Sequence, residues 1–236
     1  MTISRRALLR ASVAGGIFAV APACGAGEPD RLGLDGTPAP PDPNADVEIA
    51  TGVTLHPGED GTLPVTVRWK REIAVPEAMA VDGDRVYVAD EVPRAFALDD
   101  GTLIWETRMP GDEGFGSDGG TVIGLEGPHR LRFWAPYNSD VVVDRETGRF
   151  ISARLADGRD VPRGMHPFPT PVPPQYDFGP LDQLDPEQLT ARDRSGRVAW
   201  RITVQHPQFQ YLRPTGIPGG LLVAVTSGHL VRLDLR

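Results

Sequence analysis

ARDRSGRVAW, residues 191–200, is a polar turn between two strand-like segments, and the second segment ends in tryptophan. The same order of residue types occurs in ALDDGTLIW (97–105) and, with serine in place of tryptophan, in DRETGRFIS (144–152). In each stretch an aspartate precedes a glycine, and the Trp or Ser stands four positions after that glycine. Glycine suits a tight hairpin because it adopts positive φ, and aspartate can accept hydrogen bonds from turn amides. The three stretches therefore predict a repeated β-hairpin.

The tryptophan of each hairpin is expected to form an apolar plate between adjacent sheets. Three of the four tryptophans lie in such strands, and Trp134 is the exception. The residues that we assign to the structural repeat are Trp69, Asp99, Gly101, Trp105, Asp144, Gly148, Asp193, Gly196, Trp200 and Asp234.

Alternation of branched apolar and polar residues continues along the chain from Leu63, interrupted by Asp-Gly turns. This is strand periodicity, and no run of helical period is long enough for an ordinary helix. Short strands with frequent turns suit a sandwich, a barrel or a propeller, and internal repetition favours the propeller. The positions 105, 152 and 200 are 47 and 48 residues apart. The fold class is therefore all-β, a small or partial β-propeller of about four irregular blades.

The two ends of this region complement each other. LVRLDLR (230–236) stops where a turn and a tryptophan strand should follow, and VTVRWKREI (65–73) is a tryptophan strand without a hairpin before it. Together they make one more copy of the repeat. We therefore expect the strand of Trp69 to pair beside residues 229–235 and to close the last blade, because closure removes an open sheet edge.

These segments resemble the repeats of quinoprotein-like (PQQ-like) β-propellers, whose blades carry an Ala-x-Asp-x-x-Thr-Gly-x-x-x-Trp signature. Ala97, Asp99, Gly101 and Trp105 match it with a shortened turn, and the copies at 144–152 and 191–200 match it in part. The resemblance covers roughly residues 63–236. It implies either a scaffold lipoprotein of the cell envelope or a quinone-dependent dehydrogenase. The dehydrogenases need a larger ring with a metal-bound quinone and often a vicinal cysteine pair, so we expect no enzyme activity and no cofactor here.

The N-terminal segment resembles an export signal. Arg5 and Arg6 in SRRALLR, followed by a short uncharged apolar run, resemble a twin-arginine signal peptide. The run ends at Cys24, the single cysteine, which we expect to be the lipidated first residue of a lipoprotein, with Pro22 as a departure from that pattern. The expected organisation is a signal peptide at 1–23, a lipid-anchored proline-rich linker at 24–61 and the propeller-like domain at 62–236. The expected location is the extracytoplasmic face of the cell membrane.

Charge and cysteine content exclude several kinds of partner. Removing the three arginines of residues 1–23 from the 24 basic residues leaves 21 against 32 acidic ones, a net charge of −11. An acidic domain repels phosphate backbones, so nucleic acid is not an expected partner. Beyond Cys24 the chain has no thiol for a disulfide framework or a cysteine metal site.

Two irregular segments are candidates for binding. The acidic loop at 111–120 offers Asp112, Glu113 and Asp118 as oxygen ligands, but their spacing does not match the twelve-residue calcium loop, so no metal site is assigned. The proline-rich arm at 162–186 contains Phe168 and Tyr176 and suits either a semi-rigid recognition arm or a packed loop. The five histidines form no metal motif, and Ser227 near His229 is not triad geometry.

The sequence thus favours a non-catalytic extracytoplasmic lipoprotein that serves as a binding or scaffold module, with an envelope protein or a small ligand as partner. The first alternative is a small-ligand or sugar-binding propeller in which Trp134 and Tyr137 form an exposed aromatic platform. The alternative to an exposed platform is that LRFWAPY (131–137) is simply a buried strand. A quinone-dependent dehydrogenase is the remaining alternative.

Overall fold

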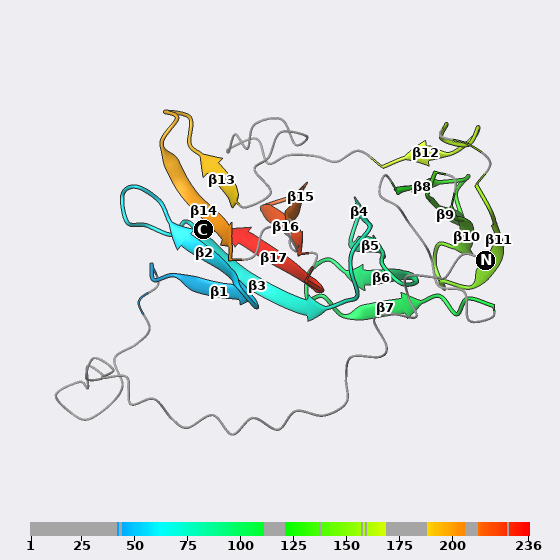
Figure 1. Ribbon diagram of the computed structural model, residues 1–236, viewed down its shortest axis with the longest axis horizontal. Helices are drawn as coiled ribbons and strands as arrows, with labels where there is room; N and C mark the ends of the chain where they lie inside the picture. Colours follow the sequence, from blue (N-terminus) through cyan, green and yellow to red (C-terminus); the bar gives the residue numbers. More distant parts are fainter. Residues whose placement is uncertain are drawn as a thin grey trace, which may run out of the picture. The chain divides into compact units, whose positions relative to one another are not determined.

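The computed structural model describes residues 42, 44–110, 121–136, 138–156, 158, 160–168, 188–205, 212–225 and 227–236. These residues belong to a unit that runs from Asp42 to Arg236. Their regular structure is entirely β-strand, arranged in four antiparallel sheets (Figure 1). The all-β prediction is therefore confirmed. No membrane-spanning helix is found among these described residues.

We number the sheets I to IV in the order in which they pack. Sheet I has the strand order β1 (Val47–Ala50), β2 (Val53–Pro57), β14 (Val198–Val204), β13 (Gln188–Arg192). Sheet II has the order β15 (Leu212–Ile217), β16 (Gly220–Val225), β17 (His229–Leu235), β3 (Val65–Glu72). Sheet III has the order β4 (Ala78–Asp82), β5 (Arg85–Ala89), β6 (Pro93–Ala97), β7 (Leu103–Glu106). Sheet IV has the order β11 (Phe150–Arg154), β10 (Asp140–Asp144), β9 (Arg130–Trp134), β8 (Val122–Leu125), β12 (His166–Pro167).

Each sheet packs on the next through a separate cluster of buried side chains. Sheets I and II share the cluster around Leu55, Trp200 and Val223; sheets II and III share the one around Trp69 and Val88. Sheets III and IV share the cluster around Tyr87 and Phe133. Inner strands of the middle sheets, such as β5 and β16, are buried on both faces, which explains the unbroken apolar run of β16. None of these clusters of described residues joins sheet IV to sheet I.

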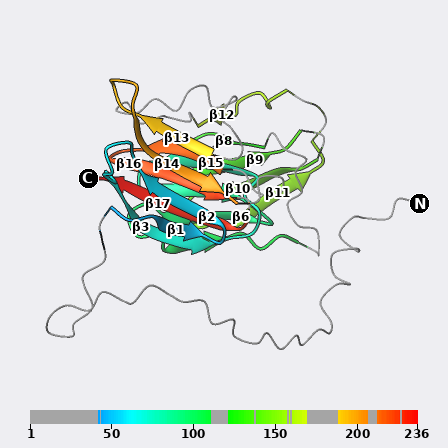
Figure 2. The same ribbon diagram turned by 60° about the vertical axis from the view of Figure 1, so that its left-hand side comes forward.

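The N-terminal strand closes sheet II as the sequence predicts. β3 pairs antiparallel with β17, with Trp69 opposite Arg232 and Val67 opposite Leu233. The two strands lie side by side in both views (Figures 1 and 2). β3 thus occupies the outer position that the sequence of β17 lacks, and residues more than 150 positions apart complete one blade.

The predicted linker is too long at its C-terminal end. Residues 47–57 form β1 and β2, which extend sheet I beyond β14. Ile49, Val53 and Leu55 are fully buried in the cluster between sheets I and II. The alternation VEIA-TG-VTL is a short hairpin signal that the proline-rich context concealed, because it follows directly on residues with nothing to bury. The part of the linker before Asp42 and the signal peptide lie outside the described residues.

All four sheets share a bulge at an equivalent point of one strand pair: β13–β14, β17–β3, β6–β7 and β10–β11. The pairing skips Arg68, Ile104, Ile151 and Ala199, each of which directly precedes the position of Trp69, Trp105, Ser152 or Trp200. A bulge adds one unpaired residue and increases the local twist. The four bulges show that these strand pairs are structurally equivalent, and no residue preference in the sequence indicates the bulges.

The start of the proline-rich arm belongs to sheet IV. His166 and Pro167 form β12, which pairs with β8 opposite Leu125 and Gly124. Gly124 permits this approach, since a Cβ there would lie 2.6 Å from the carbonyl oxygen of His166. Phe168 then stacks on Tyr87, with ring centroids 5.9 Å apart. This end of the arm is therefore packed, while Tyr176 and the rest of it lie outside the described residues.

Candidate functional site

The hairpin turns are built as the sequence indicates in two copies and differently in the third. Asp144 accepts hydrogen bonds from the amides of residues 146 and 147, and Asp193 from those of residues 195 and 197. In the β6–β7 turn the carboxylate that accepts the amide of Thr102 is Asp100, at 2.8 Å, and not the predicted Asp99.

Register explains the error at Asp99. The amide of Gly148 donates to the carbonyl of Asp144, and the amide of Gly101 donates in the same way to Ala97, each at 2.9 Å. Ala97 is therefore the structural counterpart of Asp144, so the side chain that caps the turn has moved to Asp100. All three glycines have positive φ, at 70° for Gly101, 67° for Gly148 and 84° for Gly196.

At the junction of sheets II and III, side chains of sheet II bond to the backbone of the β6–β7 turn. The indole N–H of Trp69 donates to the carbonyl of Leu98 at 3.0 Å. Arg71 Nε donates to the carbonyl of Gly101 at 2.7 Å. The Trp69 ring lies so close to Gly101 that a Cβ at that glycine would meet Cδ2 at 2.8 Å. The glycine is therefore required both by φ and by the tryptophan of the preceding sheet.

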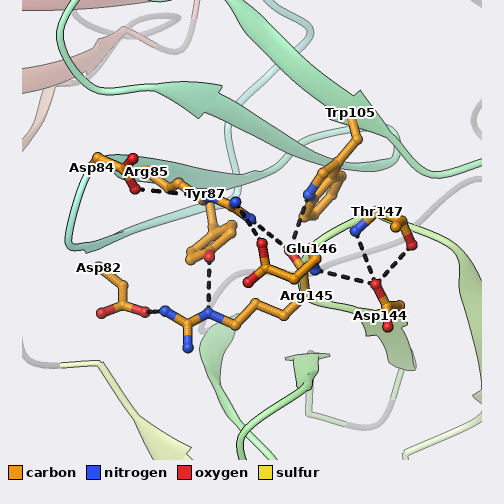
Figure 3. Close-up of polar contacts among 9 residues, drawn as sticks. All are labelled: Asp82, Asp84, Arg85, Tyr87, Trp105, Asp144, Arg145, Glu146 and Thr147. Atoms are coloured by element: carbon orange, nitrogen blue, oxygen red, sulfur yellow. Dashed lines mark hydrogen bonds and ion pairs between the residues drawn. The ribbon is translucent and has the colours of Figure 1, made fainter.

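The junction of sheets III and IV repeats this arrangement (Figure 3). The indole N–H of Trp105 donates to the carbonyl of Arg145 at 3.1 Å. The hydroxyl of Thr107, two positions after the tryptophan as Arg71 is, donates to the carbonyl of Gly148 at 3.0 Å. A Cβ at Gly148 would lie 2.5 Å from Cδ2 of Trp105. The tryptophan and the residue two positions later thus hold the next turn at both junctions.

Ion pairs at the III–IV junction link side chains of sheet III to the β10–β11 turn of sheet IV. Arg145 Nε donates to the hydroxyl of Tyr87 at 3.2 Å, and its Nη2 bonds to Asp82 (Figure 3). These contacts, with Tyr87 first, raise the pKa of the Arg145 guanidinium. Arg85 bonds to Glu146 at 2.6 Å from the opposite side. The charged hairpin tip therefore fixes two sheets together, and its groups are already paired.

The remaining members of the predicted repeat are Trp200 of sheet I and Asp234 of sheet II. Trp200 is fully buried between the two sheets. Asp234 lies inside β17 at the position that Asp193 has in its own hairpin, and it accepts a bond from Arg232 Nε at 2.6 Å. Arg232 in turn reaches the carbonyl of Leu98 at 2.6 Å. Asp234 thus orients an arginine toward sheet III instead of capping a turn.

Two buried carboxylates escaped the sequence analysis. Asp90 accepts bonds from the amides of Ala74 and Val92 and pairs with Arg94, and burial raises its pKa. It fixes the crossover between β3 and β4. Asp140 is held by Arg132 and Arg154; burial alone would raise its pKa, but these bonds outweigh it and the pKa is lowered. In the sequence each of these aspartates is a single acidic residue at the end of an apolar strand, and that pattern does not predict a buried carboxylate that binds amides or arginines.

A groove of about 440 Å³ lies beside the outer strands of sheets II and III. Its apolar part is formed by Ile73, Ala74, Phe96 and Leu103, and charged residues stand around it. Leu103 is 48% exposed and the neighbouring Ile104 is 41% exposed. Two smaller hollows, of about 220 and 380 Å³, lie beside the turn at Asp193 and beside His229. We define the first of the three as the outer groove and regard it as the candidate binding surface.

One further constellation links an acid, an imidazole and a hydroxyl. His56 contacts Asp46 through Nδ1 at 3.0 Å and Thr203 Oγ1 through Nε2 at 2.7 Å. These three residues line none of the three hollows described above, and they tie the start of β1 and β2 to β14. No group of three metal-ligating side chains occurs among the residues with described positions.

Other predicted binding residues do not come together. Trp134 is 3% exposed and packs with Ala156 and Met165, so the exposed platform proposed for it is wrong and the buried-strand reading holds. Tyr137 and the acidic loop at 111–120, with Asp112, Glu113 and Asp118, lie outside the described residues.

Comparison with known proteins bears on the repeats. Residues 58–161 match the family model described as outer membrane protein assembly factor BamB (PQQ_2), which is less than half of the chain. No protein among those of curated function matches the chain significantly. Among solved structures, BamB from Moraxella catarrhalis matches with 12% identity and a TM-score of 0.30. That match covers 81% of this chain and 57% of the BamB chain, so the chain spans little more than half of its length.

A structural similarity with a TM-score of 0.30 carries no argument about the fold or the function of this chain. The family match covers the II–III and III–IV junctions, where the tryptophans contact the next hairpin. Taken with the packing of four sheets in series, it supports one conclusion: the chain has an all-β fold of the β-propeller type, and its residues 58–161 are similar to the matched family.

Proposed function

We propose that this protein is a non-catalytic binding or scaffold module of the cell envelope, exported by the signal around Arg5 and Arg6 and anchored through Cys24. One observation carries the proposal. At successive junctions, side chains of one sheet bond to backbone carbonyls of the next turn, so the loops between the sheets have fixed relative positions. A rigid frame of this kind presents loops and edges to a partner without an ordering cost.

The family match adds a direction to this proposal. The matching model is named for an outer membrane protein assembly factor, a role played through other proteins. We therefore favour an envelope protein as the partner over a small ligand. The groups at the III–IV junction bond to each other and to backbone groups (Figure 3). Because these bonds already occupy them, they do not form an open site for a charged small ligand, which supports this choice.

Anchoring is tested by fractionation of cells that express the full-length chain and its Cys24→Ser variant. The chain should sediment with membranes and carry an acyl mass at its N-terminal residue, and Cys24→Ser should abolish both. An Arg5→Lys, Arg6→Lys double variant tests export and should leave the chain unprocessed inside the cell. If the wild-type chain is processed without any acyl group, anchoring through Cys24 is wrong.

Binding is tested by site-specific photo-crosslinking in the intact envelope. A photo-reactive residue placed in the turns at 82–85 and 144–148 should give a discrete adduct, and Trp105→Ala in the same chain should reduce it by loosening the frame. A photo-reactive residue at position 155, on the outer side of sheet IV, is the control. The scaffold role would be rejected by an absence of adducts at every turn.

A further inference from the structure

A hollow of about 380 Å³ is lined by residues of sheets I and II together. Sheet I contributes the end of β1 and the turn that follows it, and sheet II contributes the end of β3 and the start of β17. The lining residues are Glu48, Ala50, Thr51, Lys70, Glu72 and His229. We call this space the I–II hollow; Glu72 is its one lining residue that also lines the outer groove.

The strand register places the sheet II side of this hollow on the face that packs on sheet I. His229 is paired opposite Glu72, and Val231 is paired opposite Lys70. Opposite residues of an antiparallel pair project to the same face, as do residues two positions apart along a strand. Val231 is fully buried in the cluster between sheets I and II, and Ala50 of that cluster lines the hollow. The I–II hollow is therefore the polar end of the I–II junction.

The hollow contains side chains of both charges that have no partner. Lys70 and Glu72 lie on one face of β3 with their Cα atoms roughly 7 Å apart. Within the described part of the chain, no ion pair or hydrogen bond engages the side chain of either residue. At the III–IV junction, by contrast, Arg85 and Arg145 are each paired with a carboxylate. The charges of the I–II hollow are therefore available to a ligand.

An imidazole and a second carboxylate complete the lining. Nδ1 of His229 is buried and has no hydrogen-bond partner among the residues whose positions are described. A buried polar atom of this kind is rare and points to a group that is bound there. On the sheet I side, Glu48 accepts the amide of Gly52 through Oε1 at 3.3 Å, which holds its carboxylate at the β1–β2 turn.

The mixture of charges decides the class of ligand. A simple cation would meet Lys70, and a simple anion would meet the carboxylates of Glu48 and Glu72. The described residues also contain no group of three side chains that could hold a metal ion. A molecule that carries one carboxylate and one ammonium group can form a charge-assisted bond with each side of the hollow.

We propose that the I–II hollow binds a small zwitterion of about dipeptide size, with a free ammonium group at one end and a free carboxylate at the other. Lys70 pairs with the carboxylate, Glu72 and Glu48 pair with the ammonium group, and the His229 imidazole forms a further hydrogen bond. At about 30 Å³ for each water, the hollow would hold about a dozen waters, which is more room than the smallest amino acids need.

This inference is independent of the proposed envelope function. A zwitterion can bind in the I–II hollow whether or not the turns of the frame bind another protein. The two proposals are also tested by different measurements, since crosslinking at the turns does not report on occupancy of this hollow.

The test is a titration of the full-length chain, solubilised in detergent, with glycylglycine, followed by NMR of the histidine imidazole signals. His229→Gln identifies the signal of His229 among those of the five histidines. In the wild-type chain this signal should shift in a saturable way. N-acetylglycylglycine lacks the ammonium group and glycylglycinamide lacks the carboxylate. Each should bind at least about tenfold more weakly, because one charge-assisted bond is lost.

Charge reversal tests the two sides of the site separately. Lys70→Glu and Glu72→Lys should each lower the affinity for glycylglycine by about tenfold or more. The double exchange should recover part of the affinity, since the zwitterion can bind in the opposite orientation. Arg68→Glu is the matched control, because Arg68 is an exposed basic residue of β3 that does not line the hollow. It should leave the affinity unchanged.

Four results would overturn the proposal. The first is the absence of a saturable shift at His229 with glycylglycine, and the second is equal binding of the two capped forms. The third is an affinity that neither single reversal changes. The fourth is a loss with Arg68→Glu as large as that with Lys70→Glu. Because the capped ligands are compared on the wild-type chain, the test stays decisive even if a variant folds poorly.

Discussion

At the scale of single residues, the contact between a glycine and the tryptophan of the preceding sheet governs the fold. Gly148 combines a φ of 67° with the Trp105 ring, which leaves no room for a Cβ. Other positive-φ glycines, such as Gly127 at 74°, have open space where a Cβ would stand. Comparing Gly148 with Gly127 therefore separates the cost of a positive φ from the cost of a steric clash with the tryptophan ring.

We expect Gly148→Ala to lower the free energy of unfolding more than Gly127→Ala. Both variants place alanine at positive φ, which costs about 1–2 kcal/mol. Only Gly148→Ala also forces its methyl group into the Trp105 ring, which adds about 1–3 kcal/mol of overpacking. Urea unfolding of the two variants measures the difference, and equal losses would show that the ring moves aside freely.

A titration tests the turn at Asp193. The hydrogen bond from the Ser195 hydroxyl, with the amides of residues 195 and 197, lowers the pKa of Asp193 from 3.8 to about 2. Because the folded-state pKa lies below the ordinary value, this carboxylate stabilises the fold above about pH 4 and loses that effect as the pH falls toward 2. Ser195→Ala should raise the pKa of Asp193 in an NMR titration. Asp144 should titrate unchanged in the same variant.

At the scale of elements, the outer strands show how sheets are completed from distant parts of the chain. β3 completes sheet II, and the β1–β2 hairpin extends sheet I. Both additions bury side chains in the same cluster, where Leu55 of β2 is fully buried and Val65 of β3 is 1% exposed. The hairpin after the proline-rich segment is therefore a part of the core and not a spacer.

Leu55→Ala is expected to lower the free energy of unfolding by about 2–5 kcal/mol, as for other fully buried leucines. Leu155→Ala is the matched control, since Leu155 is 81% exposed, and its effect should stay within about 0.5 kcal/mol. Thermal or urea unfolding measures both. A neutral Leu55→Ala would mean that residues 47–57 are a linker after all.

At the scale of the molecule, the tryptophan plate is present wherever a sheet packs on a following one. Trp200, Trp69 and Trp105 lie at the I–II, II–III and III–IV junctions, in that order. The equivalent residue of sheet IV is the exposed Ser152. On the far face of sheet IV the ion pairs of Arg132 and Asp140 stand where the other sheets have apolar contacts. The degenerate repeat thus coincides with the end of the series among the described sheets.

Substitutions that exchange the residue types at positions 105 and 152 test this interpretation. Trp105→Ser should lower the free energy of unfolding by about 3–5 kcal/mol, since a large buried side chain is lost. Ser152→Trp should change it by less than about 0.5 kcal/mol, because the described residues place no sheet against it. Calorimetric melting of both variants checks the asymmetry. A strongly stabilising Ser152→Trp would indicate that another sheet packs on sheet IV.

Much of this architecture is readable from local patterns. Alternation of apolar residues, Asp-Gly turns and the four-residue step to tryptophan predicted the hairpins, their repetition and the pairing of β3 with β17. The candidate surface was less accessible, because edges and grooves arise from strands far apart in sequence. Asp99 was assigned wrongly since the position of a turn within its register depends on hydrogen bonds such as that from Gly101 to Ala97.

The sequence by itself determined the all-β class, the glycines at positive φ and the tryptophan plates, because each depends on residues within one hairpin. Tertiary structure alone decided that β2 covers the edge of β14, that Trp134 is buried and that Leu103 and Ile104 of β7 are exposed. These features depend on which sheet lies against which, and that is set by packing between segments more than 140 residues apart. Local propensity cannot encode such contacts, since it acts only over neighbouring positions.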